Sequence, residues 1–400
     1  MITMHAVILA AGQSTRTLPL TATKPKPLLR VANTSILEWN LHQLAGLADS
    51  LTIVVGYRAE QIREAVAALA PKRLKIGFVE QKQQNGPGGA LRAAASELPE
   101  RFLVLNGDDL YWHDDLGRLL KHDEALLAKE EKDPAKLRCF GVLEVKDDRL
   151  VRIEEKPAKP KSTWVNIGAY VLRKAVLDAK PKRSPRGEDE ITDMVTRRAV
   201  AANVAVERAA FWQPVSYPWQ LLEANEAALR LLKRDVQGTV EKGAVLKGAV
   251  AVGKGTVIRS GAYIEGPVAI GSGCVIGPNC YIRPGTSIGD ECKVGNGVEV
   301  KNSIVGNGTH IGHLSYFGDS ILGDGVNAGA GTIAANLRHD SGTVRSAVNK
   351  KLVDTGRRKL GCVLADGVHT GIHTSLYPGR KLWPGVCTLP GEVVSKDKLR

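Results

Sequence analysis

A glycine-containing turn followed by a run of basic residues is the first chemical signature of this chain. The segment AAGQSTRTLPLTATKPKPLL (10–29) follows an apolar run directly. Glycine at the end of a strand lets backbone N–H groups turn toward phosphate oxygens. Arg16 and the KPKP lysines add positive charge, and the prolines keep the chain extended. The glycine alone fits a simple βα turn; with the basic residues, the segment favours a triphosphate site.

The strands and helices that position this segment are predicted by alternating apolar runs and helical patterns. Their βαβ rhythm predicts an α/β Rossmann-like domain over residues 1–220, with a mostly parallel sheet covered by helices. We expect a linker helix over 221–238, ending at Gly238. The expected strands are HAVILAA (5–11), SLTIVVG (50–56), LKIGFVE (74–80) and RFLVLNGDD (101–109), and the helices include SILEWNLHQLAGL (35–47) and AEQIREAVAAL (59–69).

Residues 239–400 follow a different period. An aliphatic residue stands at every sixth position from Val240 to Val300, with small and polar residues between. Helices repeat at 3.6 residues and half-buried strands at 2, so a period of six indicates coils of short flat faces. Stacked coils bury a continuous apolar column, which predicts a left-handed parallel β-helix of hexapeptide repeats. The series is Val240, Leu246, Val252, Ile258, Ile264, Ile270, Ile276, Ile282, Ile288, Val294 and Val300.

The phase of the repeat shifts by one residue at Val305 and again at Leu322. The repeat is lost over about 334–363 and resumes at Leu364. The non-repeating stretch is basic. Such a loop is commonly a solvated excursion, and it could instead reach a neighbouring subunit or a phosphorylated cofactor.

Composition narrows the class of protein. The 400 residues suit two or three domains, and a hydrophobic content of 43% is ordinary for a globular protein. No run of eighteen apolar residues occurs, so we expect no membrane span. The net charge of +13 is spread along the chain, which argues weakly against a dedicated nucleic-acid surface, and phosphorylated substrates would suit this charge equally well. Six scattered cysteines without a CxxC pair indicate buried thiols and a cytoplasmic location.

The N-terminal motifs resemble, in order, those of sugar-1-phosphate nucleotidylyltransferases. Besides the opening segment, the similar elements are EQKQQNGPGGAL (80–91), LNGDD (105–109), EEKP (154–157), VNIGAY (165–170) and GEDEITD (187–193). The resemblance implies in-line attack of a sugar-1-phosphate on the α-phosphorus of a nucleoside triphosphate, driven by positioning and charge neutralisation. It assigns catalysis to Arg16 and Lys26, nucleotide binding to Ala11, Gly12, Gln81 and Gly86, sugar-phosphate binding to Gly141, Glu155, Lys156 and Asn166, and Mg²⁺ to Asp108.

Three positions depart from that family pattern. Ser14 replaces a second glycine, and Pro87 stands where Thr or Ser often follows the glycine of the base loop. Pro214, in WQPVSYPWQLLEAN (212–225), matches a position that usually offers a second metal-binding Asp. The last change predicts weaker nucleotidyl transfer, unless Asp109 or water compensates.

The segment IGHLSYFGDSILGDGVNAGAGTIAAN (311–336) resembles the acetyltransferase half of bifunctional enzymes that make UDP-N-acetylglucosamine. The resemblance makes His313 the general base for attack of an amine on acetyl-CoA, a role that suits a neutral imidazole. Taken alone, His313 would be an ordinary surface histidine. Asn336 would orient the reacting groups, Arg283 and Lys301 would hold the sugar phosphate, and Tyr316 and Asn327 its hydroxyls.

Other features of this half match the family pattern less closely. Leu337 stands where bacterial members often carry Tyr, and the basic stretch 338–359 resembles archaeal-type members more closely. His310, His339, His369 and His373 lack supporting motifs, so we expect them to be structural or solvent-exposed.

Three hypotheses follow from these motifs. The first is a bifunctional enzyme that acetylates glucosamine-1-phosphate, with galactosamine-1-phosphate as the alternative acceptor, and transfers UMP from UTP to the product. It would act as a homotrimer with nucleoside triphosphate, sugar-1-phosphate and acetyl-CoA as substrates. The second is a single-activity glucose-1-phosphate thymidylyltransferase or uridylyltransferase with a trimerising β-helix. The third is a non-catalytic, nucleotide-binding regulatory subunit, against which the joint presence of Arg16, Asp108 and His313 argues.

Overall fold

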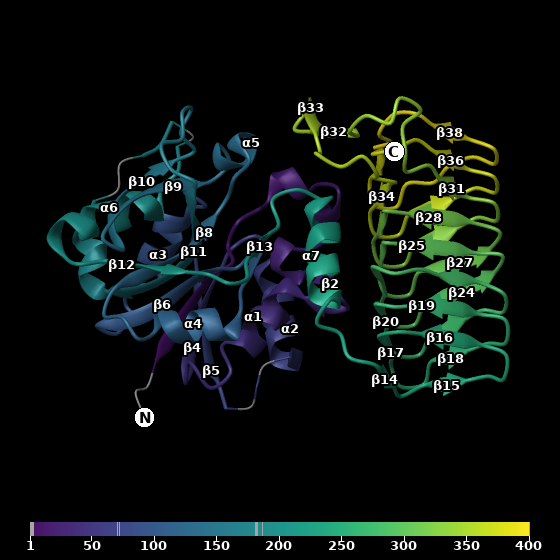
Figure 1. Ribbon diagram of the computed structural model, residues 1–400, viewed down its shortest axis with the longest axis horizontal. Helices are drawn as coiled ribbons and strands as arrows, with labels where there is room; N and C mark the ends of the chain where they lie inside the picture. Colours follow the sequence, from purple (N-terminus) through teal and green to yellow (C-terminus); the bar gives the residue numbers. More distant parts are fainter. Residues whose placement is uncertain (1–3, 70, 72, 181–182, 186, 400) are drawn as a thin grey trace. The chain divides into compact units, whose positions relative to one another are not determined.

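The computed structural model of the chain describes residues 4–69, 71, 73–180, 183–185 and 187–399. These residues form two compact units (Figure 1). Unit 1 comprises Met1–Gln13 and Ile36–Pro214, and unit 2 comprises Ser14–Ser35 and Val215–Arg400. The basic segment after the first strand therefore leaves unit 1 and packs with the repeat region.

Unit 1 is built on a nine-stranded sheet of order β5-β4-β1-β6-β11-β8-β12-β10-β9. Its core includes Val7, Phe102, Val104 and Tyr170, all fully buried. The strands are β1 (His5–Leu9), β4 (Ser50–Val55), β5 (Lys75–Glu80), β6 (Arg101–Asn106), β8 (Ala125–Glu130), β9 (Gly141–Lys146), β10 (Arg149–Glu155), β11 (Trp164–Arg173) and β12 (Ala205–Arg208), with a small pair β7 (Asp109–Leu110) and β13 (Gln213–Pro214) beside them.

The expected strands and helices of this unit are confirmed, but the sheet is more mixed than the βαβ pattern predicted. Strands β5, β4, β1 and β6 are parallel, whereas β11 runs antiparallel to both β6 and β8. Strands β9 and β10 form a hairpin whose turn residues Asp147 and Asp148 have positive φ, the backbone that a tight hairpin turn requires. The helices are α1 (Ile36–Gln43), α2 (Ala59–Leu69), α3 (Pro87–Ala93), α4 (His113–Leu119), α5 (Pro134–Leu137) and α6 (Ile191–Ala201).

Unit 2 contains the predicted left-handed β-helix, drawn from teal to yellow in Figure 1. Three parallel sheets form its faces. The first face is β14 (Asp235–Val236), β17 (Val250–Val252), β20 (Val268–Ile270), β23 (Thr286–Ile288), β26 (Ile304–Val305), β29 (Ile321–Leu322), β34 (Val363–Leu364) and β37 (Lys381–Leu382). The second is β15 (Thr239–Val240), β18 (Val257–Ile258), β21 (Val275–Ile276), β24 (Lys293–Asn296), β27 (His310–His313), β30 (Asn327–Ala328) and β35 (His369–Thr370). The third is β16 (Val245–Lys247), β19 (Tyr263–Glu265), β22 (Tyr281–Ile282), β25 (Glu299–Lys301), β28 (Tyr316–Gly318), β31 (Ile333–Ala334), β36 (Ser375–Leu376) and β38 (Val393–Val394).

The hexapeptide residues point into this prism. Ile258, Ile276 and Val294 are stacked neighbours on one face and are fully buried. Ile270 pairs with Ile288, so one full coil takes 18 residues. Ile288 pairs with Val305, one residue less, which accounts for the first phase shift of the sequence repeat. Val240, in the terminal coil, is 39% exposed because no coil covers it from below.

The basic stretch leaves the β-helix as a hairpin. Strands β32 (Arg345–Val348) and β33 (Lys351–Asp354) pair antiparallel, with Asn349 and Lys350 in the left-handed turn. The following Arg357 returns to the β-helix, and its side chain is 15% exposed. Its Nη2 lies 3.2 Å from Glu226 Oε1 and 3.8 Å from Asp319 Oδ1. This stretch is therefore an ordered element, and its Arg357 is held by acidic side chains.

Helix α7 (Gln220–Leu229) is shorter than the expected helix over 221–238. Residues after it already enter the first coil, where a Cβ on Gly238 would lie 2.9 Å from Val252 Cγ1. Glycine at 238 thus serves close packing against the next coil. Asn225, buried on α7, accepts hydrogen bonds from Ala32 N (2.7 Å) and Ser287 Oγ (2.8 Å). It joins the helix, the short strands β2 (Arg30–Val31) and β3 (Thr34–Ser35), and the β-helix.

The remaining expectations are met in part. No helix in the described ranges combines the length and apolarity needed to cross a bilayer. All six cysteines are free thiols, and four are buried, but Cys139 and Cys387 are exposed. Burial raises the pKa of Cys280 and of Cys362 to about 12. His310, His339, His369 and His373 are exposed.

Candidate active sites

The nucleotide-site candidates of unit 1 gather where the chain reverses its path through the sheet. From β1 the chain moves outward to β4 and β5, then returns to β6 on the other side of β1. In open α/β sheets, ligands bind at the carboxyl ends of strands at such a reversal. Ala11 and Gly12 follow β1, and Asp108 follows β6.

Gly12 leaves open space at this edge. A Cβ placed on Gly12 would meet no atom within 4 Å. By contrast, Gly107, at the end of β6, packs so tightly that a Cβ would lie 2.7 Å from the Leu9 carbonyl. Packing within the protein therefore explains Gly107 and leaves Gly12 free to meet a ligand. Ala11 is buried, and its carbonyl accepts from Tyr57 N at 3.0 Å.

The base-recognition candidates form a tightly bonded loop. Gln81 is buried, and its Nε2 donates to Asn85 Oδ1 (2.8 Å) and to the Gly86 carbonyl (3.1 Å). Asn85 Nδ2 in turn donates to Asp189 Oδ2 at 3.0 Å. The segment 187–193 thus touches the base loop. Asn85 and Asp189 were not singled out from the sequence, although Asn85 stands next to the glycine of the motif.

Position 86 requires glycine. Its φ is 103°, a region that residues with a Cβ rarely adopt. A Cβ there would also lie 2.7 Å from the Asp189 carbonyl. Pro87, a departure from the family pattern, occupies the first turn of α3, where its missing N–H costs no hydrogen bond.

Two carboxylates follow β6. Asp109 is buried and accepts a hydrogen bond from Trp212 Nε1 at 3.1 Å. Pro214 pairs with Asp109 across β13 and β7, so the departure lies beside the acidic pair. Burial raises the pKa of the nearby Tyr111 phenol well above its ordinary value, and the charges of Asp109 and Asp108 add to that rise.

This donor set fits Mg²⁺. Asp108 is half-buried and offers hard oxygen ligands, and Mg²⁺ commonly takes one or two carboxylates while waters and substrate phosphates complete the octahedron. No group of three or more His, Cys, Asp or Glu that could enclose a metal occurs among the described residues.

The sugar-binding candidates lie at the other strands of the sheet. Glu155 Oε1 is 3.3 Å from Lys156 Nζ, and Gly141 pairs with Glu155 across β9 and β10. A Cβ on Gly141 would lie 3.0 Å from Glu155 Oε2, so glycine leaves room for that carboxylate. Asn166 Nδ2 donates to Tyr170 Oη at 2.6 Å.

Arg16 and Lys26 belong to unit 2, with the rest of Ser14–Ser35. Arg16 is exposed, with its guanidinium 5.7 Å from the ring centroid of Tyr217. Lys26 is 3% exposed. Ser14 has φ 54° and ψ 53°, the left-handed conformation that explains why glycine is usual there.

The segment that carries Arg16 and Lys26 is fastened to the β-helix. Lys24 pairs with Asp324 and, at 3.1 Å, with Asp366. Arg30 Nη1 donates to Asn307 Oδ1 at 2.9 Å.

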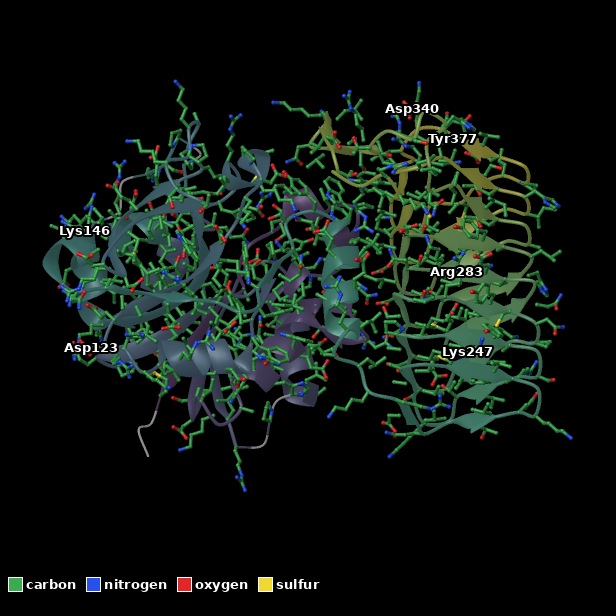
Figure 2. The ribbon with its side chains drawn as sticks, viewed as in Figure 1. Asp123, Lys146, Lys247, Arg283, Asp340 and Tyr377 are labelled. Atoms are coloured by element: carbon green, nitrogen blue, oxygen red, sulfur yellow. The ribbon has the colours of Figure 1, made fainter. Side chains whose placement is uncertain are left out.

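The acetyl-transfer candidates lie mostly on the third face of the β-helix. Tyr281, Glu299 and Tyr316 stack in register there, and Lys301 pairs with Gly318. Arg283, labelled in Figure 2, follows β22 on this face, and its Nη1 donates to Glu299 Oε1 at 2.8 Å. That contact raises the pKa of Arg283, so its positive charge is secure.

Asn336 and Tyr316 meet in the same place. Asn336 Nδ2 lies 3.3 Å from Tyr316 Oη. Burial raises the pKa of the Tyr316 phenol, and the carboxylates of Glu299 and Asp319 add to that rise. Tyr316 therefore stays a neutral hydroxyl that can donate and accept hydrogen bonds.

His313 and Asn327 come from the second face. His313 ends β27 and is exposed, and β28 begins with Tyr316 after the corner. Asn327 is exposed on β30 and pairs with His310. Thus Arg283, Lys301, Tyr316 and Asn336 share one face, while His313 stands at its edge and Asn327 on the neighbouring face.

Asp319 is a central residue of this site that the sequence reasoning missed. It is 3% exposed, and its carboxylate accepts from Asn336 Nδ2 (2.6 Å) and Asn302 Nδ2 (2.8 Å). Lys301 Nζ lies 3.6 Å from it. The only signal in the sequence was its position within the YFGDS segment, three residues after Tyr316.

Comparison with known proteins places this geometry in a family. A family model described as nucleotidyl transferase matches residues 5–230, and one described as GMPPB C-terminal domain matches residues 264–377. Over 394 residues the chain is 38% identical to the bifunctional protein GlmU of Methanocaldococcus jannaschii, covering 96% of this chain and 94% of that protein. The chain belongs to the bifunctional GlmU family.

Other relatives agree with membership of the GlmU family. A bifunctional sugar-1-phosphate nucleotidylyltransferase/acetyltransferase of Sulfurisphaera tokodaii is 35% identical over 405 residues and matches 98% of each chain. A solved UDP-glucose pyrophosphorylase complexed with UDP-glucose covers 57% of this chain and 99% of its own, with TM-score 0.52 and 20% identity, which supports the nucleotidyltransferase fold. The GlmU relatives match 95–98% of this chain, so the single-activity hypothesis and the regulatory hypothesis are not favoured.

Proposed function

We propose that this GlmU-family chain makes UDP-N-acetylglucosamine in two steps. The first step acetylates glucosamine-1-phosphate on the third face of the β-helix. The second transfers UMP from UTP to N-acetylglucosamine-1-phosphate at the carboxyl edge of the unit 1 sheet. The observation that carries the proposal is the polar cluster of Lys301, Tyr316 and Asn336 beside His313. A β-helix that served only as a scaffold would not need this cluster.

In acetyl transfer, the sugar amine attacks the thioester carbonyl of acetyl-CoA. A C–N bond forms, the C–S bond breaks, and coenzyme A leaves as the thiol. His313 would take the proton from the attacking amine, for which its exposed place at the edge of the face is suited. Arg283 and Lys301 would hold the sugar phosphate, and Tyr316 and Asn327 the hydroxyls. Asn336 would orient the reacting groups.

In nucleotidyl transfer, the sugar phosphate oxygen attacks the α-phosphorus of UTP and pyrophosphate leaves. Ala11 and Gly12 would line the phosphates, Gln81 and Gly86 the base, and Gly141, Glu155, Lys156 and Asn166 the sugar phosphate. Arg16 and Lys26 would neutralise the charge that develops on the phosphoryl groups. Mg²⁺, when bound at Asp108, would supply further charge neutralisation and orient the phosphates.

The proposal includes a homotrimer and a cytoplasmic location. Exposed apolar side chains recur on the third face, including Ile333 (44%), Tyr377 (53%) and Val393 (57%). Apolar side chains at such exposure on one sheet favour burial against another copy, which would place the acetyl-transfer residues of this face at the boundary between two copies. Four buried free thiols suit a reducing compartment.

One reaction mixture tests both activities. The chain is incubated with glucosamine-1-phosphate, acetyl-CoA, UTP and Mg²⁺, and products are resolved by mass spectrometry. We expect N-acetylglucosamine-1-phosphate and its UDP derivative. A reaction that stops at the acetylated sugar phosphate would point to Pro214 beside Asp109 and to other nucleotides as the next substrates. Absence of both products would overturn the proposal.

A further inference from the structure

We propose that Asp319 is a positioning residue for acetyl transfer: it fixes the orientation of the Asn336 carboxamide so that the carbonyl oxygen of Asn336 faces the acceptor amine. This inference rests on the proposed acetyltransferase function of the third face. Its basis is the hydrogen-bond geometry around one buried carboxylate.

The two oxygens of Asp319 have separate partners. Oδ2 accepts from Asn336 Nδ2 at 2.6 Å and lies 3.6 Å from Lys301 Nζ. Oδ1 accepts from Asn302 Nδ2 at 2.8 Å and lies 3.8 Å from Arg357 Nη2. A carboxylate that is 3% exposed needs such partners because an unpaired buried charge is costly. Asp319 is therefore a buried acceptor whose two oxygens are each held by a separate set of donors.

This arrangement decides which way the Asn336 amide points. The NH₂ group of Asn336 has two protons, and its nitrogen lies in hydrogen-bond reach of Asp319 Oδ2 and Tyr316 Oη. A flipped amide would set its oxygen against the carboxylate, bringing two acceptors together without a proton. Asp319 thus fixes the NH₂ group of Asn336 and leaves Oδ1, on the other side of the amide, as the acceptor for a ligand.

An attacking amine needs a hydrogen-bond acceptor beside it. A neutral amine attacks through its lone pair, and its N–H groups must point elsewhere. A carbonyl oxygen that accepts one N–H aims the lone pair, and such orientation contributes to the rate of the chemical step. An amide NH₂ in the same place would offer a donor and would compete for that lone pair.

Further contacts hold Asp319 itself. Asn302 Nδ2 also donates to Glu226 Oε1 of α7 at 3.0 Å, and Arg357 Nη2 lies 3.2 Å from the same oxygen. Gly318, between Tyr316 and Asp319, leaves the room in which Tyr316 and Asn336 meet, since a Cβ there would lie 2.6 Å from Asn336 Nδ2. Arg357 of the basic stretch and the helix α7 therefore both support the carboxylate.

The first test is Asp319→Asn in the full-length chain. The new amide can donate as well as accept, so it no longer enforces one orientation of Asn336. We expect kcat for acetylation of glucosamine-1-phosphate to fall about 10- to 100-fold, with KM for the sugar phosphate within about threefold. A change confined to KM would instead assign the effect to Lys301 and the phosphate, and would overturn the proposal.

A double-mutant cycle asks whether Asp319 acts through Asn336. Asn336→Ala alone should lower kcat. Adding Asp319→Asn to it should cost no further activity, because the side-chain amide that Asp319 orients is then absent. Independent, additive losses would show a general structural role and overturn the inference. Asp290→Asn is the matched control. Asp290 Oδ1 accepts from Ser272 N, and in the next coil Asn307 Oδ1 accepts from Asp290 N in the same way, so asparagine fits at this kind of position. Acetyl transfer should not change.

The exchanged pair Asp319→Asn with Asn336→Asp provides a second variant that keeps one carboxylate and one amide in place. It should recover part of the activity lost in the single variant, and it carries the test if Asp319→Asn does not fold. A folded exchanged pair without acetyl transfer would contradict the proposal. Wild-type protein that acetylates no amino-sugar phosphate would overturn the proposed function and this inference with it, whereas active wild type with a fully active Asp319→Asn would overturn this inference alone.

Discussion

Lys381 Nζ donates a hydrogen bond to the carbonyl of Leu18 at 3.3 Å, although 363 residues separate the two in the sequence. The same ammonium group also donates to the carbonyl of Ala347 at 2.6 Å. Lys381 is 1% exposed on the first face of the β-helix. One buried lysine thus joins the segment that carries Arg16, the basic hairpin and the last coils of unit 2.

The burial of Lys381 predicts a pH-dependent stability. Burial lowers its pKa to about 8, from 10.5 for a free lysine. Below pH 8 the folded and unfolded chains are both protonated there, and the buried charge lowers the free energy of unfolding. Between about pH 8 and 10.5 the unfolded chain holds more protons, so stability rises with pH and the penalty is gone above that window. Lys381→Met removes the titrating group, so its stability should lack the rise between pH 7.5 and 10 that wild type shows.

Chemical denaturation at the two pH values checks this prediction. The full difference in the free energy of unfolding across the window is about 3 kcal/mol, from about 1.4 kcal/mol per pH unit. The exposed Lys396, changed to Met, controls for loss of one positive charge. Parallel pH curves for Lys381→Met and wild type would mean that the lysine does not titrate in this range.

Separate sites for the two reactions should respond to separate substitutions. His313→Ala removes the proposed base and should lower acetyl transfer by about 100-fold or more, within the range for general base catalysis, while nucleotidyl transfer is unchanged. Asp108→Ala should do the reverse, because it removes the proposed Mg²⁺ ligand. Each variant is assayed with each half-reaction alone. Loss of both activities in a chain that stays folded would contradict two independent sites.

The backbone at Gly86 makes the base loop sensitive to one methyl group. Gly86→Ala places a Cβ 2.7 Å from the Asp189 carbonyl in a residue with φ of 103°. The loop must shift, so we expect kcat/KM for UTP to fall about tenfold or more, a loss of about 1.4 kcal/mol or greater. Acetyl transfer should not change.

Gly77→Ala is the control for that substitution. Gly77 lies on β5, which leads to Gln81, and a Cβ there meets no atom within 4 Å. We expect wild-type kinetics from it. Equal losses from both alanines would show that the loop geometry at Gly86 is not what limits UTP use.

The exposed apolar side chains of the third face predict an oligomer. Light scattering should give a mass of about three times the 42.9 kDa chain. Val393→Asp places a charge in the proposed interface and should give monomers, because an unpaired charge is costly to bury. Val200→Asp, at a position 84% exposed on α6, should leave the trimer intact. A wild-type monomer at micromolar concentration would refute the proposed trimer.

The sequence by itself determined the two architectures and most candidate residues. A period of six cannot satisfy a helix or a single strand, so the inward positions such as Ile258 and Ile276 were readable directly, and they are fully buried. The phase shift at Val305 was also visible, because losing one residue from a coil moves every later residue. The sequence also offered Gly12 as a candidate, through the basic residues that follow its turn, and Asp108 through the resemblance of LNGDD to a family motif.

Only the tertiary structure decided which residues touch across long separations. Asp319 makes its contacts with Asn302, Asn336 and Arg357 through stacked coils and a returning hairpin, none of which the local pattern reveals. The packing of Ser14–Ser35 with the β-helix, through Lys24 and Lys381, likewise depends on partners some 300 residues away. Periodicity records which side of its own strand a residue faces, whereas hydrogen-bond partners depend on where distant strands finally lie.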